Sequence, residues 1–198
     1  MGHAGAAAFA VRYLGAGPVE ALPRPELRCV REGERAPVGQ AEFRRVLGGF
    51  ASGVTVITAP AADGGPGPAG FACQSFSALS LEPPLVCFMV GRASTTWPRI
   101  ARAGVFCVNV LGAAQEELCR AFAVSGADKF AGVAYDAAPA SGSPRLAGAD
   151  AWIDCTVHAV HTGGDHLIVV GRVDALGADG PGEPLLFHRG RFARLADG

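Results

Sequence analysis

Short apolar runs, separated by glycine, proline and polar residues, follow one another along most of this chain. Residues 54–58 are rich in β-branched side chains and predict a strand, and the loose alternation over residues 70–80 predicts another. A glycine–proline cluster at 63–68 lies between them, so we expect a hairpin. Residues 85–90 form a continuous apolar run that predicts a strand buried on both faces, and residues 105–110 predict another buried strand.

The second half of the chain continues this pattern. Residues 153–161 and 166–176 predict two strands joined by a glycine-rich turn. A last hairpin is expected around Arg189-Gly190, because apolar runs flank that dipeptide. We find no internal repeat.

Helical spacing is confined to three short segments. Residues 42–50 place four apolar side chains on one face of a helix. Hydroxyl residues followed by Trp97-Pro98 mark a second helix start, and residues 115–122 predict the third helix. Strands outnumber helices and do not alternate regularly with them, so the expected fold class is mainly β, an antiparallel barrel with a few flanking helices.

Composition narrows the classes of function. The chain has 198 residues, 49% of them hydrophobic, and a net charge of −1, which argues against nucleic acid as a partner. No apolar run reaches the length of a membrane span, and the N-terminal apolar stretch is too weak for a signal peptide. We therefore expect a flexible N-terminal extension at 1–38 and one domain at 39–198.

The six cysteines show no C-x-x-C spacing, and several lie inside apolar runs, as Cys87 and Cys107 do. Such thiols are typical of small buried side chains in a reduced protein. A cytoplasmic location is the expectation that follows.

The stretch from Gly70 to Pro84 carries the first candidate chemistry. It combines Gln74, Ser75 and Ser80 with apolar residues and no charge before Glu82. Small hydroxyl and amide groups suit the wall of a flat ligand that takes neutral hydrogen bonds. A solvated edge strand explains the same pattern equally well.

Two further segments could bind parts of a ligand. Residues 92–96 supply one arginine and three hydroxyls, which favours an anion such as phosphate, although one hydroxyl would suffice for an ordinary helix cap. The turn at 163–166 contains His166, which the turn does not need. His158 and His161 are three apart on a predicted strand and make a poor metal pair, so we expect no metal site. The chain also lacks a G-x-G-x-x-G fingerprint, a Walker A loop and a G-x-S-x-G elbow.

Together these segments resemble the flavin reductase-like, FMN-binding split-barrel family, the small components of two-component flavin-dependent monooxygenases. The resemblance covers about residues 43–195. Its marks are, in chain order, residues 51–58 (ASGVTVIT), 70–76 (GFACQSF), 80–86 (SLEPPLV), 128–132 (DKFAG), 163–166 (GGDH) and 184–190 (PLLFHRG). It implies an antiparallel Greek-key split β-barrel.

The resemblance also implies a site. The flavin ring would lie against residues 68–75, the flavin phosphate at residues 92–96, and the nicotinamide at the turn 163–166, where His166 would position it. Many members have Thr-Ala-Asn where this chain has Ala72-Cys73-Gln74, so one hydroxyl contact to the ring is absent here. The cofactor-binding residues implied in this way are Gly70, Phe71, Ala72, Gln74, Ser75, Ser80, Arg92, Ser94, Thr95, Thr96, Phe122, Lys129, Phe130, Gly163, Gly164 and Asp165.

The implied function is an NAD(P)H:flavin oxidoreductase that reduces FMN or FAD and supplies reduced flavin to a partner monooxygenase. The resemblance further implies a homodimer. Two alternatives stay open: an oxidase on the same fold that retains its flavin, and a non-catalytic flavin sensor or carrier. The sequence does not choose between FMN and FAD, or between NADH and NADPH.

Overall fold

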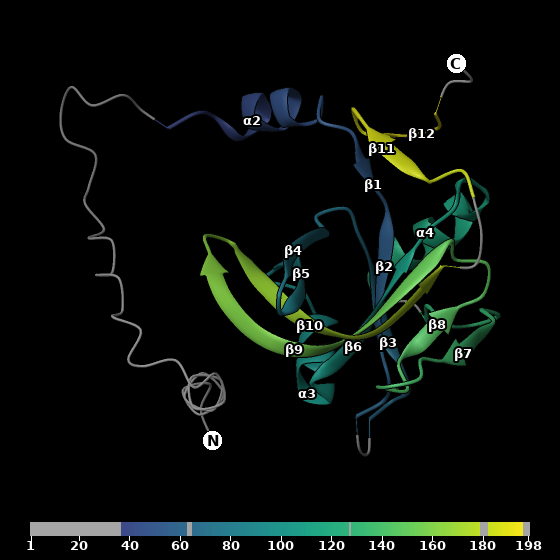
Figure 1. Cartoon of the computed structure of the whole chain (residues 1–198). Coiled ribbons are helices and arrows are strands. Elements are labelled where there is room, and N and C mark those ends of the chain that lie inside the picture. Colours follow the sequence, from purple (N-terminus) through teal and green to yellow (C-terminus); the bar gives the residue numbers. More distant parts are fainter. Residues whose placement is uncertain (1–36, 63–64, 127, 179–181, 196–198) are drawn as a thin grey trace, which may run out of the picture. The chain divides into compact units, whose positions relative to one another are not determined.

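The structure, a computed structural model, describes residues 37–62, 65–126, 128–178 and 182–195 (Figure 1). It divides into two parts, one ending at Gly49 and one beginning at Phe50, and each is described by itself. The extension expected over residues 1–38 lies outside the described residues except at its last two positions. None of the helices in the described ranges is long and apolar enough to cross a membrane.

The first part contains helix α2, Gln40–Leu47, where the amphipathic spacing predicts a helix. Glu42 and Arg45 form an ion pair on its surface at 2.7 Å. Its apolar side chains Phe43 and Val46 are both exposed. The helix is therefore amphipathic, as its spacing predicts.

Antiparallel strands form the main sheet of the second part, in the order β3-β2-β6-β9-β10-β5-β4 (Figure 1). The strands are β2 (Thr55–Ala59), β3 (Ala69–Cys73), β4 (Ser77–Leu81), β5 (Pro84–Gly91), β6 (Val105–Val110), β9 (Ala151–Gly163) and β10 (His166–Ala178). Strands β3 and β4 follow each other in the chain, yet they form the two opposite edges of this sheet. The antiparallel split barrel that the sequence predicts is confirmed.

Smaller elements surround the barrel. A second sheet joins β1, β11 and β12, and a separate hairpin pairs β7 with β8. The remaining elements are β1 (Ser52–Gly53), α3 (Trp97–Ala103), a 3₁₀ turn (Ala113–Gln115), α4 (Glu116–Ala123), β7 (Tyr135–Ala137), β8 (Pro144–Leu146), β11 (Leu186–His188) and β12 (Arg191–Ala193). The predicted helices and the last hairpin are confirmed.

Strands β9 and β10 curve strongly, as Figure 1 shows, and two irregularities in their pairing explain the curvature. The register shifts between Val170 and Gly171 and again between Val173 and Ala175. Such bulges bend a strand and increase its twist. At Gly171 a Cβ atom would lie 2.3 Å from Cζ of Phe106, so only glycine lets that ring lie against the backbone of β10.

The two edges of the sheet meet where residues 74–76 carry the chain from β3 to β4. There the Ser75 hydroxyl donates to the Met89 carbonyl at 3.0 Å and accepts from the Met89 N–H at 3.1 Å. Phe71 of β3 and Phe88 of β5 also make an edge-to-face contact, with ring centroids 5.9 Å apart. Since β5 carries the other edge strand β4, these contacts close the split of the barrel.

Aromatic rings fill the larger of the two main core clusters. Phe88 lies at its centre and makes edge-to-face contacts with Phe71, Trp97 and Phe106. A second cluster packs under α4 around the fully buried Phe122. Edge-to-face pairs of this kind each contribute about 0.5–1.5 kcal/mol beyond the apolar area that they bury.

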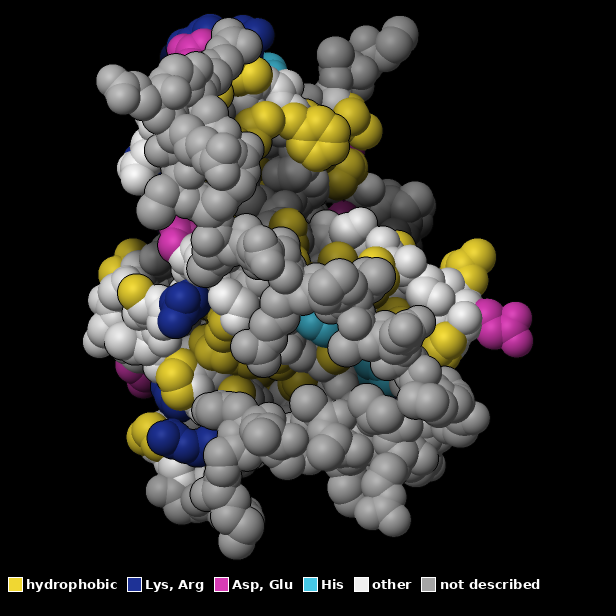
Figure 2. All heavy atoms as spheres, turned by 90° about the vertical axis from the view of Figure 1, so that its left-hand side faces the viewer, with side chains coloured by type: hydrophobic (Ala, Val, Ile, Leu, Met, Phe, Trp, Pro, Cys, Tyr) yellow, Lys and Arg dark blue, Asp and Glu magenta, His cyan; other side chains and the backbone are white. Residues whose placement is uncertain are grey.

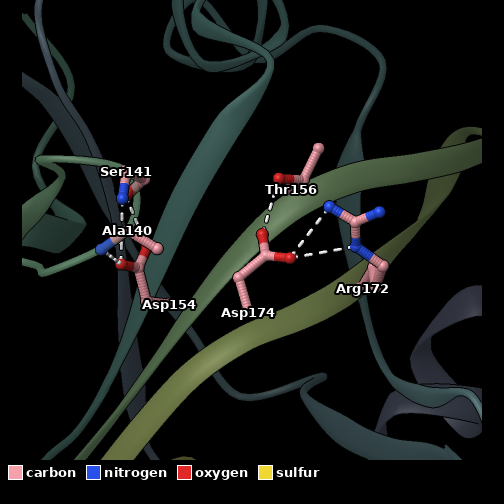
Figure 3. A network of polar contacts seen from close by, with 6 residues as sticks. All are labelled: Ala140, Ser141, Asp154, Thr156, Arg172 and Asp174. Carbon is pink, nitrogen blue, oxygen red and sulfur yellow. Dashed lines mark hydrogen bonds and ion pairs between the residues drawn. The ribbon is translucent and has the colours of Figure 1, made fainter.

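Two aspartates on β9 and β10 serve the fold (Figure 3). Asp154 is fully buried and accepts from the N–H groups of Ala140 and Ser141 at 2.8 and 3.0 Å, and from the Ser141 hydroxyl. Asp174 instead points toward Thr156 and Arg172. Its carboxylate accepts from the Thr156 hydroxyl at 2.6 Å and from Nε of Arg172 at 2.9 Å. Both carboxylates are thus saturated by the protein's own donors.

The structure corrects two of the predicted strands. Residues 70–80 do not form one strand, because the chain leaves the ladder at residues 74–76 to cross from one sheet edge to the other. Strand β5 is buried on one face only: Val86 and Phe88 point inward, whereas Met89 is 41% exposed. The continuous apolar run there reflects a strand with an apolar outer face. The strand at 105–110 is buried as expected.

The hairpin of β7 and β8 is not predicted by the sequence, since both strands are short and of mixed polarity. It is attached to the barrel through the buried side chain of Asn109. The Oδ1 atom of Asn109 accepts from the Leu146 N–H at 2.7 Å, and its Nδ2 atom donates to the Val56 carbonyl at 3.2 Å. A fully bonded amide in the core can hold such a hairpin without apolar periodicity.

Candidate functional site

A pocket of about 420 Å³ opens between the start of β3, the segment before α3 and the loop after α4. Five residues of the implied site meet there, from three separate stretches of the chain. They are Gly70, Thr95, Thr96, Lys129 and Phe130. The wall is completed by Pro66, Pro68, Ala69, Arg99, Gly126 and Asp128.

Two cations line this pocket, and main-chain oxygens hold both. Arg99 donates through one terminal nitrogen to the carbonyls of Gly67 and Pro68, at 2.9 Å each. Lys129 donates to the carbonyls of Gly70 and Phe122, at 3.2 and 3.0 Å. Within the described ranges neither cation has an ion pair with a carboxylate, so their charges are available to an anionic ligand.

Burial and a like charge both act on Lys129. Partial removal from water disfavours its charged form, and the nearby Arg99 guanidinium disfavours it further, so the pKa of Lys129 lies below the usual 10.5. The described wall of the pocket therefore carries two cations, Arg99 and Lys129, and one carboxylate, Asp128.

Hydroxyl groups on the segment before α3 also line the pocket. Thr95 is exposed and Thr96 half-buried, and both line the wall. The neighbouring Ser94 hydroxyl accepts from the N–H of Trp97, the first residue of α3, at 3.2 Å. Arg92 is exposed on the same segment and does not line the pocket.

Gly70 forms the floor of the pocket, and Phe122 lies directly beneath it. A Cβ atom at Gly70 would come within 2.7 Å of the Phe122 ring and 3.1 Å of the Ile57 carbonyl. Phe122 itself is fully buried in the core under α4. The structure thus brings Phe122 under the pocket instead of into its wall.

The remaining implied residues of the stretch at 70–80 do not line the pocket. Phe71 and Ala72 are partly buried against the two core clusters, and Gln74 is exposed. The Ser75 hydroxyl is occupied by the main chain of Met89. Ser80 is half-buried on the edge strand β4, away from the pocket wall.

The turn between β9 and β10 lies beside the segment at 92–96. The Arg92 N–H donates to the Asp165 carbonyl at 3.0 Å, and His166 pairs with Gly91 across the sheet. Gly164 has a φ of +68°, which favours glycine in this turn. The His166 ring is half exposed, and its Nδ1 atom lies 2.8 Å from Oδ1 of Asp165.

Sequence reasoning missed Arg99 as a site residue. It follows the hydroxyl run by three positions, so the helical spacing of α3 could have placed it beside Thr96. In the described part of the chain, no group of three or more histidine, cysteine and acidic side chains is arranged to hold a metal ion.

Comparison with known proteins identifies the family. The model of the flavin reductase like domain matches residues 47–196. The chain is 51% identical, over 77% of its length and 76% of the relative, to the reductase subunit HsaB of a flavin-dependent monooxygenase from Rhodococcus jostii. It is 39% identical, over 81% of its length and 88% of the relative, to an NADH-dependent FAD reductase from Streptomyces globisporus.

Solved structures agree with this match. Nitrilotriacetate monooxygenase component B from Mycobacterium thermoresistibile is 46% identical with a TM-score of 0.74, covering 79% of this chain and 87% of that one. The NADH:FAD oxidoreductase SgcE6 of Streptomyces globisporus, in complex with NAD and FAD fragments, also has a TM-score of 0.74, at 39% identity, covering 79% of this chain and 93% of that one. The chain therefore belongs to the family of the flavin reductase like domain.

Lys129 is the only lysine in the sequence, so its pKa can be measured by chemical labelling. We expect acylation of Lys129, followed by mass spectrometry across a pH series, to give a pKa below 10.5, because burial and Arg99 both favour the neutral amine. Arg99→Ala should raise this pKa by removing the like charge. A pKa at or above 10.5 in the unchanged protein would contradict the described pocket.

Proposed function

We propose that this protein is an NAD(P)H:flavin oxidoreductase that reduces FMN or FAD and supplies the reduced flavin to a partner monooxygenase. The observation that carries the proposal is the pocket beside Gly70, where Arg99 and Lys129 form no ion pair with a carboxylate of the described residues. The names of the related proteins, a monooxygenase reductase subunit and an NADH-dependent FAD reductase, support it.

The residues of the pocket fit a flavin phosphate. Two main-chain-anchored cations and the hydroxyls of Thr95 and Thr96 are a donor set suited to phosphate oxygens. Glycine at position 70 lets the buried Phe122 ring pack against the main chain of the pocket, since a Cβ atom there would lie 2.7 Å from that ring. We assign the phosphate end of the flavin to this pocket and its ring to the neighbouring segment at residues 71–75.

The assigned cofactor-binding residues keep the order that the resemblance implies. The ring side comprises Phe71, Ala72, Gln74 and Ser75, the phosphate side Thr95, Thr96, Lys129 and Phe130, and the nucleotide side Gly163, Gly164, Asp165 and His166. The Ser75 hydroxyl is already bonded to the main chain of Met89. We therefore assign the neutral hydrogen bonds to the ring to the main chain of residues 72–75.

Flavin and pyridine nucleotide together supply the redox chemistry, a hydride transfer that requires their rings to be stacked roughly 3–3.5 Å apart. The protein's contribution is to hold both. His166 and Asp165 present a paired edge at the end of the β9–β10 hairpin, next to the segment that leads to Thr95. His166 positions the nicotinamide there and takes no proton from the substrate. The shallow, solvent-facing placement of this turn suits a nucleotide and a flavin that both exchange with solution.

Steady-state oxidation of NADH and NADPH, with FMN or FAD added, tests the proposed function. We expect turnover that depends on added flavin and saturates in both substrates, because both are bound reversibly. A yellow protein that turns over without added flavin would indicate a retained-flavin oxidase instead. Flavin binding without oxidation of either nucleotide would indicate a carrier or sensor, and would overturn the proposal.

His166→Ala tests the nucleotide side. We expect the KM for NADH to rise about tenfold, the loss of one to two hydrogen-bonded contacts, while the flavin Kd changes by less than twofold. His161→Ala is a matched control, since His161 is also exposed on β9 but lies outside the turn. Equal losses for nucleotide and flavin would show that His166 maintains the pocket and does not position the nicotinamide.

We also propose that the protein works as a homodimer in the cytoplasm. Apolar side chains on the outer faces of β4 and β5 support the dimer: Leu79, Leu81 and Met89 are 53%, 94% and 41% exposed. Apolar side chains are also visible among polar ones on the face that Figure 2 shows. Five free cysteines in the described ranges support a reducing compartment.

Light scattering tests the dimer. The measured mass should be twice the chain mass of 20.1 kDa, and a monomer at micromolar concentration would refute the dimer.

A further inference from the structure

Arg99 stands out among the residues of the pocket because its charge is not needed by the fold. Arg99 and Arg102 both belong to α3, yet only Arg99 lines the pocket, and Arg102 is exposed elsewhere on the helix. One terminal nitrogen of Arg99 donates to both Gly67 and Pro68. Neutral donors could make those two bonds equally well, and the other guanidinium nitrogens remain for a ligand.

The charges that face this position are few. Lys129 lies close enough for Arg99 to lower its pKa, so the two cations repel each other. The acidic residue of the wall, Asp128, is exposed and accepts from the Phe130 N–H at 3.2 Å. It forms no ion pair with either cation in the described structure. Two adjacent cations that form no ion pair with a carboxylate in the described part of the chain favour the ligand that brings the most negative charge to one point.

The flavins differ in this property. Riboflavin has no phosphate, and the diphosphate of FAD spreads its charge as one unit on each phosphorus. The monoester phosphate of FMN carries about 1.5 to 2 negative charges near pH 7, with a second pKa of about 6. If the positive charge of the pocket acts at one phosphate, the affinity of the three ligands follows the charge of that phosphate.

We propose that Arg99 is a specificity-determining residue that makes the pocket rank flavins by phosphate charge, with FMN preferred to FAD and FAD preferred to riboflavin. The proposal rests on the proposed function for the identity of the ligand. Beyond the proposed function, Arg99 would determine which flavin binds most tightly.

Calorimetric titration of the full chain with each oxidised flavin, at pH 7.5 and low salt, tests the ranking without relying on turnover. Arg99→Ala should raise the Kd for FMN about tenfold and for FAD about threefold, and should change that for riboflavin by less than twofold. Arg99→Lys should recover most of the loss for FMN, because it restores the charge. Arg102→Ala, the charge control on the same helix, should bind all three flavins like the unchanged protein.

One further variant and one further condition separate the effect of the charge from an effect on the structure. Arg99→Gln keeps an amide that can donate to Gly67 and Pro68 but removes the charge, so it should show the same order of losses as Arg99→Ala. At pH 5.0 the FMN phosphate is a monoanion, so the FMN penalty of Arg99→Ala should fall to that of FAD. The variant and the unchanged protein are compared at the same pH, so any effect of pH that is common to both cancels.

Equal losses for all three flavins, a larger loss for FAD than for FMN, or an FMN penalty independent of pH would each overturn the role of Arg99. These outcomes are distinct from failure of the proposed function. If the binding order appears but no nucleotide is oxidised, the reductase assignment fails and the role of Arg99 stands. If the nucleotide reduces flavin but the three flavins do not bind in this order, the role of Arg99 fails and the reductase assignment stands.

Discussion

The closure of the barrel by Ser75 is the contact on which the rest of the structure depends. Strands β3 and β4 are opposite edges of one curved sheet, and the chain must cross between them within three residues. Ser75 makes two hydrogen bonds to the main chain of Met89 at this crossing. Each contributes about 0.5–1.5 kcal/mol, and together they hold the two edges at β5.

This closure also positions the site. Strand β5 runs directly into the segment at 92–96, so the contact that ties β3 to β5 brings Gly70 toward Thr95 and Thr96. Arg99 and Lys129 then bind carbonyls at the start of β3 from α3 and from the loop after α4. Three distant stretches of sequence thus share one pocket. The same polar residues that make 70–80 a poor core strand allow the chain to leave the ladder there.

The sequence predicts most of the elements, because β-branched runs and turn residues are local signals. It predicts less well what depends on tertiary contacts. The apolar run at 85–90 suggests burial on both faces, yet Met89 faces outward. The β7–β8 hairpin escapes prediction since its anchor, Asn109, lies on another strand. In the site, the hydroxyls at 94–96 and the turn at His166 are visible as motifs. For Arg99 the sequence offers only its helical spacing from Thr96, because its place beside Lys129 depends on the fold.

The central claim is that one flavin occupies the pocket beside Gly70 with its phosphate at Arg99 and Lys129, and meets its nucleotide at the turn of His166. A crystal structure of the protein with FMN and NAD⁺ bound measures this directly. We expect phosphate oxygens within hydrogen-bond distance of the Arg99 and Lys129 side chains, the flavin ring along residues 71–75, and the nicotinamide against the turn at 163–166. A flavin bound elsewhere, or one with its phosphate away from both cations, would contradict it.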